Sequence, residues 1–163
     1  ADKLGKKEIA GQYTQKAKEM AVEWERMAND GDHYKLTFDK SGTWSQKYNL
    51  VWDKLMNWQI FPEQIVKTEI PYYLTKQNRY GLPLDNRQTY TKTDWIMWTA
   101  TLAPDKATFE EFIEPVYLFM NETTDRIPMS DWVFTDKPEH RAFQARSVVG
   151  GYFIKMLENK MNN

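Results

Sequence analysis

The chain has 163 residues, the size of one domain with a single hydrophobic core. Its 22 Lys and Arg residues nearly balance its 23 Asp and Glu residues, and no basic stripe runs along the sequence, so nucleic acid is not expected as a partner. No apolar run approaches the ~20 residues that span a bilayer. Cysteine is absent, which excludes a thiol nucleophile, a disulfide framework and a thiolate metal site. We predict one domain over residues 1–163, with no nucleic acid and no membrane as partner.

Aromatic residues are abundant: 7 Trp, 9 Tyr and 8 Phe make up 15% of the chain. Large rings can simply fill a core. Many of these rings fall in polar segments, however, which favours a surface for a sugar or another small polar ligand, where rings stack and hydrogen-bond together.

Helical spacing of apolar residues dominates the first half of the chain. It predicts a long first helix from about residue 6 to residue 29, a second helix over 48–55 and a third over 66–73. Pro62 suits the first turn of the third helix, because that turn needs no amide donor.

The same spacing predicts a fourth helix over 95–102, with Thr93 as its N-cap, and a fifth over 109–120. Thr108 and Glu111 match the capping-box pattern at the start of the fifth helix.

A sixth helix is predicted from about residue 147 to residue 156, with Gly150-Gly151 permitting a close approach of a neighbouring backbone. Pro71 and Pro115 are expected to kink or split the helices that contain them, because proline lacks the amide proton and crowds the preceding turn. Residues 34–38 alternate weakly and favour at most a short ribbon. The predicted class is all-α.

Short and long connections alternate between these helices. The joins between the second and third and between the fourth and fifth helices are short, whereas the other three are long. If successive helices run antiparallel, the three long loops lie at the same end of the bundle. Loops of this length in a compact domain are usually functional or disordered, and these are too aromatic for disorder.

Each long loop places an aspartate beside a ring, in the pairs Asp32-His33, Asp94-Trp95 and Asp131-Trp132. Paired carboxylates in a water-poor site can divide acid and base roles. The alternative is that each Asp caps a helix or turn while the ring packs beneath it. We predict Asp32, Asp94 and Asp131 as the catalytic candidates.

Six further residues of the loops are predicted to bind substrate. His33 can serve as a general base or bond a loop carbonyl, and Arg146 can clamp a carboxylate or fasten the third loop. His33 and His140 lack metal-ligand spacing, so neither a metal nor a cofactor is expected. The predicted substrate-binding residues are His33, Trp44, Tyr90, Trp95, Trp132 and Arg146.

Several segments agree in order with one known family. The segments 31–34, 42–50, 91–95 and 143–151 resemble the glutaminase A family of long secreted proteins from fungi and gut-type Bacteroides. The resemblance covers the C-terminal part of such proteins. It implies about three hairpins, half of a six-hairpin (α/α) toroid preceded by β-rich domains, and a secreted or periplasmic location. The first five residues, which look like the end of a preceding helix, agree with a piece of a longer protein.

The family name implies hydrolysis of L-glutamine to glutamate and ammonia, but fold does not fix function. The leading hypothesis is an amidohydrolase in which Asp32, Asp94 and Asp131 activate water, with no cofactor and with the upstream part of the same protein as partner. A glycoside hydrolase, with tryptophans stacked on sugar rings, is the second hypothesis. A non-catalytic helical scaffold or carbohydrate-binding module is the third, and the chain alone is expected to be inactive.

Overall fold

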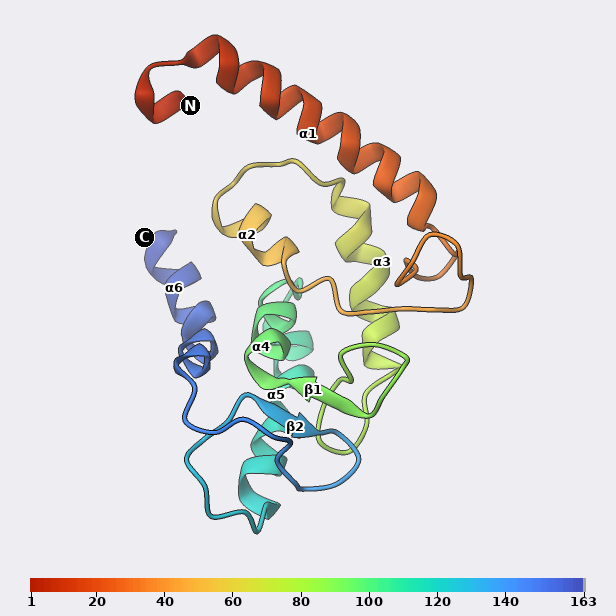
Figure 1. Ribbon diagram of the computed structural model, residues 1–163, viewed down its shortest axis with the longest axis vertical. Helices are drawn as coiled ribbons and strands as arrows, with labels where there is room; N and C mark the ends of the chain where they lie inside the picture. The colour runs from red at the N-terminus through yellow and green to blue at the C-terminus, as the bar shows by residue number, and fades with distance from the viewer. Residues whose placement is uncertain (163) are drawn as a thin grey trace.

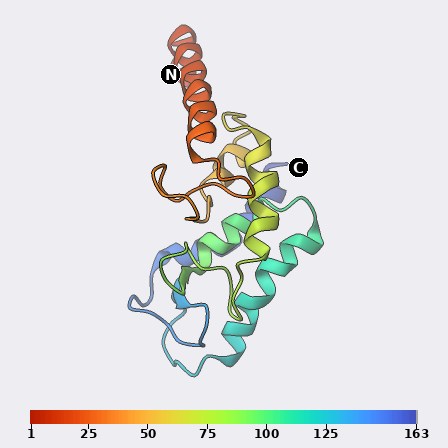
Figure 2. The ribbon, with the colours of Figure 1, turned by 90° about the vertical axis from the view of Figure 1, so that its right-hand side faces the viewer.

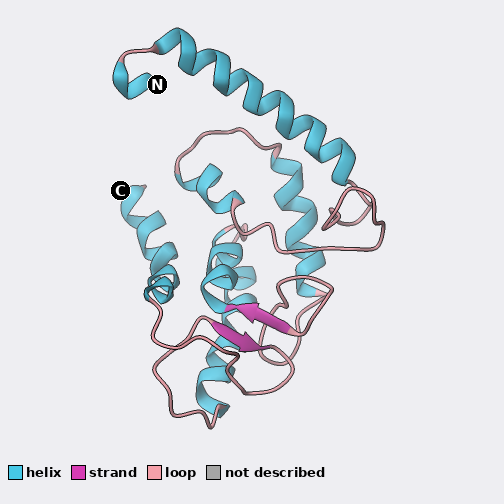
Figure 3. Ribbon diagram, in the orientation of Figure 1, coloured by secondary structure: helices cyan, strands magenta, loops and turns pink. Residues whose placement is uncertain are grey.

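The computed structural model describes residues 1–162. Within them the chain is built from α-helices, with one two-stranded antiparallel sheet (Figures 1 and 3). In chain order the elements are η1 (Asp2–Leu4), α1 (Lys7–Ala28), α2 (Leu50–Leu55), α3 (Glu63–Leu74), β1 (Tyr90–Lys92), α4 (Thr93–Thr101), α5 (Lys106–Glu122), β2 (Trp132–Phe134), η2 (Ser147–Phe153) and α6 (Ile154–Met161), where η marks a 3-10 helix. The predicted all-α class of helical hairpins is confirmed.

The hydrophobic core surrounds α4. Ile96 and Ala100 of this helix are fully buried, because its apolar positions recur at helical spacing and face neighbours on several sides. The buried residues packed with them come from α2, α3, α5 and α6: Val51, Leu55, Ile70, Tyr73, Phe112, Val116 and Ile154. The core therefore fixes α4 rigidly, and with it the loops that precede and follow this helix.

The connections alternate as predicted. Residues 56–62 and 102–105 form the short joins, and residues 29–49, 75–89 and 123–146 form the long loops. The first loop meets the second through the Gln46 N–H, which donates to the Leu84 carbonyl at 2.9 Å. The second meets the third where β1 pairs with β2 (Figure 1). The three loops thus form one continuous hydrogen-bonded region.

Helix α1 projects away from the rest of the molecule (Figure 2). Of its residues only Ala21 and Ala28 are buried, while Tyr13 and Met20 are 73% and 63% exposed. Its C-terminal end is anchored by Trp24, which stacks on Tyr34 with ring centroids 5.5 Å apart. The helix was predicted correctly, but most of its apolar stripe faces outward. No helix among residues 1–162 is long and apolar enough to cross a membrane.

Both predicted N-terminal caps are wrong. Lys92 occupies the N-cap position of α4, and Thr93 is its first residue, bonded instead to the third loop. In α5 the cap is Asp105, whose carboxylate accepts the Thr108 N–H at 2.8 Å, so Thr108 and Glu111 form no capping box. An acidic residue three positions upstream of that amide competes successfully for it.

The proline, strand and last-helix expectations have different outcomes. Pro71 and Pro115 do not split α3 and α5, which continue through them, and a kink at either proline stays a prediction. Residues 34–38 form no strand: only an isolated bridge links Tyr34 to Asn29. The last helix begins as the 3-10 helix η2 and becomes α-helical only at Ile154, in agreement with the poor helix propensity of its two glycines.

Candidate active site

Strand pairing brings two of the predicted aspartates together. Strand β1 leads directly into α4, and β2 follows Asp131 directly, with Lys92 opposite Trp132 in the ladder. Beyond the ladder, the N–H and hydroxyl of Thr93 both donate to the Asp131 carbonyl, at 2.7 and 3.0 Å. Asp94 and Asp131 therefore stand on adjoining chain segments, although 36 residues of sequence lie between them.

Asp131 is buried and is held by two cations. Its side chain is 1% exposed, and its Oδ2 lies 2.6 Å from Lys92 Nζ and 3.3 Å from Arg146 Nη1. Arg146 therefore fastens the third loop by binding a carboxylate of the chain itself. The cations also offset the free-energy cost of burying the negative charge of Asp131.

Asp94 has an unusually basic carboxylate. Asp94 is 3% exposed. Its burial is the larger cause, and the negative charge of Asp131 the second cause, of a rise in its pKa to about 6. Both effects disfavour the charged form. A carboxyl group with this pKa exchanges protons near neutral pH, as general acid–base chemistry requires.

The 3-10 helix η2 covers this pair of carboxylates. A Cβ on Gly151 would lie only 2.9 Å from the Asp94 Cβ and 2.9 Å from Trp98 Nε1. Gly151 therefore lies close to side chains of α4, not to a neighbouring backbone as was predicted for Gly150-Gly151, whereas a Cβ at Gly150 would meet nothing within 4 Å. The next residue, Tyr152, hydrogen-bonds to the hydroxyl of Thr93.

Tyr152 of η2 takes part in a hydrogen-bonded network with the residues beside Asp94. Burial, with the charges of Asp94 and Asp131, raises the pKa of Tyr152 to about 12. Its phenol thus stays protonated at neutral pH and keeps the Thr93 hydroxyl in a hydrogen-bonded network with the Asp131 main chain. This network links η2 to the residue that follows β1, Thr93, and to the residue that precedes β2, Asp131.

The third predicted aspartate belongs to a different group. The Asp32 side chain is 79% exposed, and its Oδ1 lies 2.7 Å from Nδ1 of His33. The hydrogen bond from His33 lowers the pKa of Asp32. His33 stacks on Tyr72 of α3 at 4.4 Å, and Trp44 packs edge-on against the same ring at 6.1 Å. Asp32, His33 and Trp44, all from the first loop, therefore form a group beside Tyr72 of α3. This group is separate from the Asp94–Asp131 pair.

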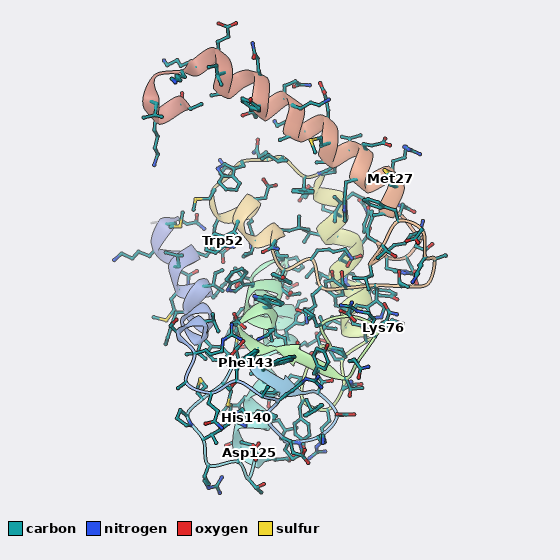
Figure 4. All side chains as sticks on the ribbon, viewed as in Figure 1. Met27, Trp52, Lys76, Asp125, His140 and Phe143 are labelled. Atoms are coloured by element: carbon teal, nitrogen blue, oxygen red, sulfur yellow. The ribbon has the colours of Figure 1, made fainter. Side chains whose placement is uncertain are left out.

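The remaining predicted rings are packed against the protein. Tyr90 and Trp132 share the outer face of the β-ribbon with centroids 5.4 Å apart, and the Arg141 guanidinium lies over both. Phe143, on the loop beside the ribbon (Figure 4), stacks on Trp132 at 5.1 Å. Trp95 stacks on Tyr48 at 4.0 Å.

Trp95 and Tyr48 also line an open groove of about 790 Å³ between α1 and the first two loops. Their neighbours there include Met20 and Trp24 from α1 and Gln46 from the first loop. The groove is mainly apolar, and Trp95, one of the residues that line it, directly follows Asp94 in the chain. It offers a volume typical of small-molecule sites.

Sequence reasoning missed several residues of the site. Lys92, Trp98 and Tyr152 were assigned no role, because Lys92 finds its partner 39 residues away and the two rings were attributed to the core. The available signal was local: Lys92 stands two residues before Asp94 in the chain, and Tyr152 follows the glycine pair. Near the lower end of the molecule, His140 pairs with Asp125 at 3.1 Å (Figure 4). No set of three or more His, Asp or Glu side chains within residues 1–162 is arranged to hold a metal ion.

Comparison with known proteins decides the family. The family model described as the glutaminase A six helical-hairpin domain matches residues 1–156. The chain belongs to the glutaminase A family. Both the family resemblance and the helical-hairpin architecture expected from the sequence are thereby confirmed.

Two curated members of the glutaminase A family match most of the chain. It is 28% identical over 160 residues to Glutaminase A of Aspergillus oryzae, covering 94% of this chain and 23% of that protein. It is 26% identical over 174 residues to a protein of Arthroderma benhamiae named "Probable glutaminase", covering 87% of this chain and 20% of that protein. The chain thus spans less than a quarter of the length of these relatives. No solved structure matches.

Proposed function

We propose that this chain carries catalytic residues of a glutaminase A-like hydrolase, which converts the side-chain amide of L-glutamine into glutamate and ammonia. The names of the two family members support this activity. The observation that carries the proposal is the buried pair Asp94 and Asp131, in which the pKa of Asp94 is raised to about 6 and the Asp131 carboxylate lies beside two cations.

Asp94 is the proton-transfer group in this proposal. Its ionised carboxylate accepts a proton from a water molecule as the water oxygen attacks the amide carbon, and the C–N bond then breaks. Asp94 returns the proton to the leaving nitrogen, which departs as ammonia, and the new carboxylic acid ionises. The charge of Asp131 keeps Asp94 basic, and Lys92 with Arg146 keeps Asp131 in place.

A glycoside hydrolase also uses two carboxylates, so the pair alone fits both reactions. The rings, however, favour the amidohydrolase. Of the three tryptophans expected to stack on sugars, Trp44 is only 6% exposed, and Trp132 has Phe143 on one face and Lys92 and Arg141 nearby. Trp95 has Tyr48 on one face and lines the mainly apolar groove. A sugar-binding platform needs open ring faces.

The test uses the natural full-length protein, because this chain spans only part of its relatives. Ammonia release from L-glutamine is measured beside sugar release from an oligosaccharide panel. Asp94→Asn is expected to lose ammonia release and Asp131→Asn to retain only a residual activity, while Asp39→Asn, a change at an exposed aspartate of the first loop, keeps ammonia release. Sugar release without ammonia release would overturn the proposal in favour of a glycosidase, and activity on neither substrate would favour a scaffold.

A further inference from the structure

Three buried polar atoms near η2 have no hydrogen-bond partner among the described residues. They are Asp94 Oδ1, Asp131 Oδ1 and Trp98 Nε1. Leaving such atoms unpaired costs free energy, about 1–3 kcal/mol for each. Native proteins satisfy most buried polar groups, so a cluster of unpaired ones indicates a place where a ligand supplies the missing hydrogen bonds.

All three atoms belong to side chains that their neighbours hold in place. Asp94 and Trp98 stand one helical turn apart on α4, and the Asp94 Cβ and Trp98 Nε1 both lie 2.9 Å from the Cβ position of Gly151. The Trp98 ring is wedged edge-on against Trp52 at 5.2 Å. The Asp131 carboxylate is anchored through Oδ2 by Lys92, which leaves Oδ1 available.

We infer that these atoms form a binding site for a primary carboxamide, in which the two aspartate oxygens accept its two N–H groups and the Trp98 indole N–H donates to its carbonyl oxygen. A primary amide offers two donors and a carbonyl acceptor, and the cluster offers two acceptors and one donor. The inference rests on the proposed function and deepens it, because it assigns the contacts that select the amide.

The same contacts explain how product is released. A carboxylate in this position has no N–H to donate, and its charge faces those of Asp94 and Asp131. A site built around specific buried hydrogen bonds strongly rejects analogues that cannot form those bonds, by up to about 10⁴-fold. Glutamate formed at the site is therefore expelled, and a tertiary amide, which has no N–H, is not bound.

The Trp98 indole also acts on the reaction. As water adds to the amide carbon, negative charge develops on the carbonyl oxygen, and a fixed donor stabilises that charge. Removing one such donor costs a factor of about 10² to 10³ in kcat in enzymes where this has been tested.

Entry to the site requires η2 to move, because Gly151 and Tyr152 close over Asp94 and Thr93. A 3-10 helix is suited to such movement, since its hydrogen bonds are weaker than those of an α-helix. The segment between β2 and η2, residues 135–146, provides the length of chain that this movement needs.

The experiment measures binding separately from turnover. Saturation-transfer NMR is recorded on the full-length protein with propionamide, propionate and N,N-dimethylpropionamide as probes. We expect a signal from propionamide alone, and we expect Trp98→Phe, which keeps a ring but removes the N–H, to weaken it about tenfold. Trp52→Phe is the matched control, since Trp52 packs against Trp98 without belonging to the cluster. Circular dichroism confirms that both variants fold.

Equal binding of propionamide and its dimethyl derivative by the wild type would overturn the inference, and so would unchanged propionamide binding by a folded Trp98→Phe variant. Glutamine turnover is assayed in parallel. If propionamide binds as expected but glutamine is not hydrolysed, the proposed function fails and the carboxamide site stands. If glutamine is hydrolysed and Trp98→Phe keeps the wild-type kcat and KM, the site assignment fails and the function stands.

Discussion

The carbonyl oxygen of Asp131 accepts two hydrogen bonds from Thr93, one from its N–H and one from its hydroxyl. These bonds join the residue before Asp94 to the residue that carries the second carboxylate. The main chains that carry the two acids are thus fixed directly against each other. Such positioning suits a site in which the charge of one carboxylate must act on the pKa of the other.

The first prediction concerns the pH dependence of activity. Asp94 acts as a base only when ionised, so kcat/KM for glutamine is expected to rise with pH through about 6. Asp131→Asn removes the negative charge that helps to raise the pKa of Asp94. The residual activity of that variant should therefore rise at a lower pH. A pH profile with an unchanged midpoint would show that the charge of Asp131 does not act on the titrating group.

The second prediction concerns stability. Burial and Asp131 raise the pKa of Asp94 from 3.8 to about 6, so the folded protein binds this proton more tightly than the unfolded chain does. The contribution to stability is present below pH 4 and is lost as pH rises through about 6; at neutral pH the buried charge costs up to about 3 kcal/mol. Asp94→Asn should therefore raise the unfolding midpoint at pH 7.5 while abolishing activity. Thermal melts at pH 4 provide the control, because the gain should vanish there.

The third prediction separates the two cations that hold Asp131. Lys92→Met keeps most of the side-chain stem but leaves a carboxylate that is 1% exposed without its nearer partner, so a loss of about 3–5 kcal/mol is expected. Arg146→Met should cost less, since the Arg146 side chain is 35% exposed and its contact is longer, 3.3 Å. Urea unfolding of both variants measures the difference, and equal losses would contradict this ranking.

The fourth prediction tests the separation of Asp32 from the catalytic pair. Asp32 is mostly exposed and interacts with His33, whereas the charges that act on Asp94 come from Asp131 and Lys92. Asp32→Asn is therefore expected to keep kcat within about twofold of the wild type, as surface substitutions usually have small effects. Loss of ammonia release by a folded Asp32→Asn variant would return Asp32 to the active site.

Periodicity predicted the helices well because it depends only on neighbours along the chain. The first helix was expected over residues 6–29 and spans Lys7–Ala28. Which of its faces is buried depends on what lies against it, and that information is absent from the local pattern. Strands β1 and β2 have three residues each, too few for a periodic signal, and their paired residues are 40 to 44 positions apart in the sequence.

The alternation of loop lengths predicted the gathering of the loops, and with it the Asp94–Asp131 pair. It could not give the order of the loops. The first loop hydrogen-bonds to the second through Gln46, and the second pairs with the third through the β-ribbon. Asp32, on the first loop, lies beside α3 instead. The ion pair of Lys92 with Asp131 depends on the register in which the two strands pair, and the local sequence pattern does not contain that register.

The fifth prediction compares the two adjacent glycines of η2. A methyl group at Gly151 would lie 2.9 Å from both the Asp94 Cβ and Trp98 Nε1, so Gly151→Ala must push η2 away from α4. Overpacking of this kind costs about 1–3 kcal/mol and should also reduce kcat by displacing Tyr152 from Thr93. Gly150→Ala is the matched control, because its methyl group meets nothing within 4 Å. Thermal unfolding and ammonia release should therefore change in Gly151→Ala alone, and equal behaviour of the two variants would show that η2 does not rest closely on Asp94.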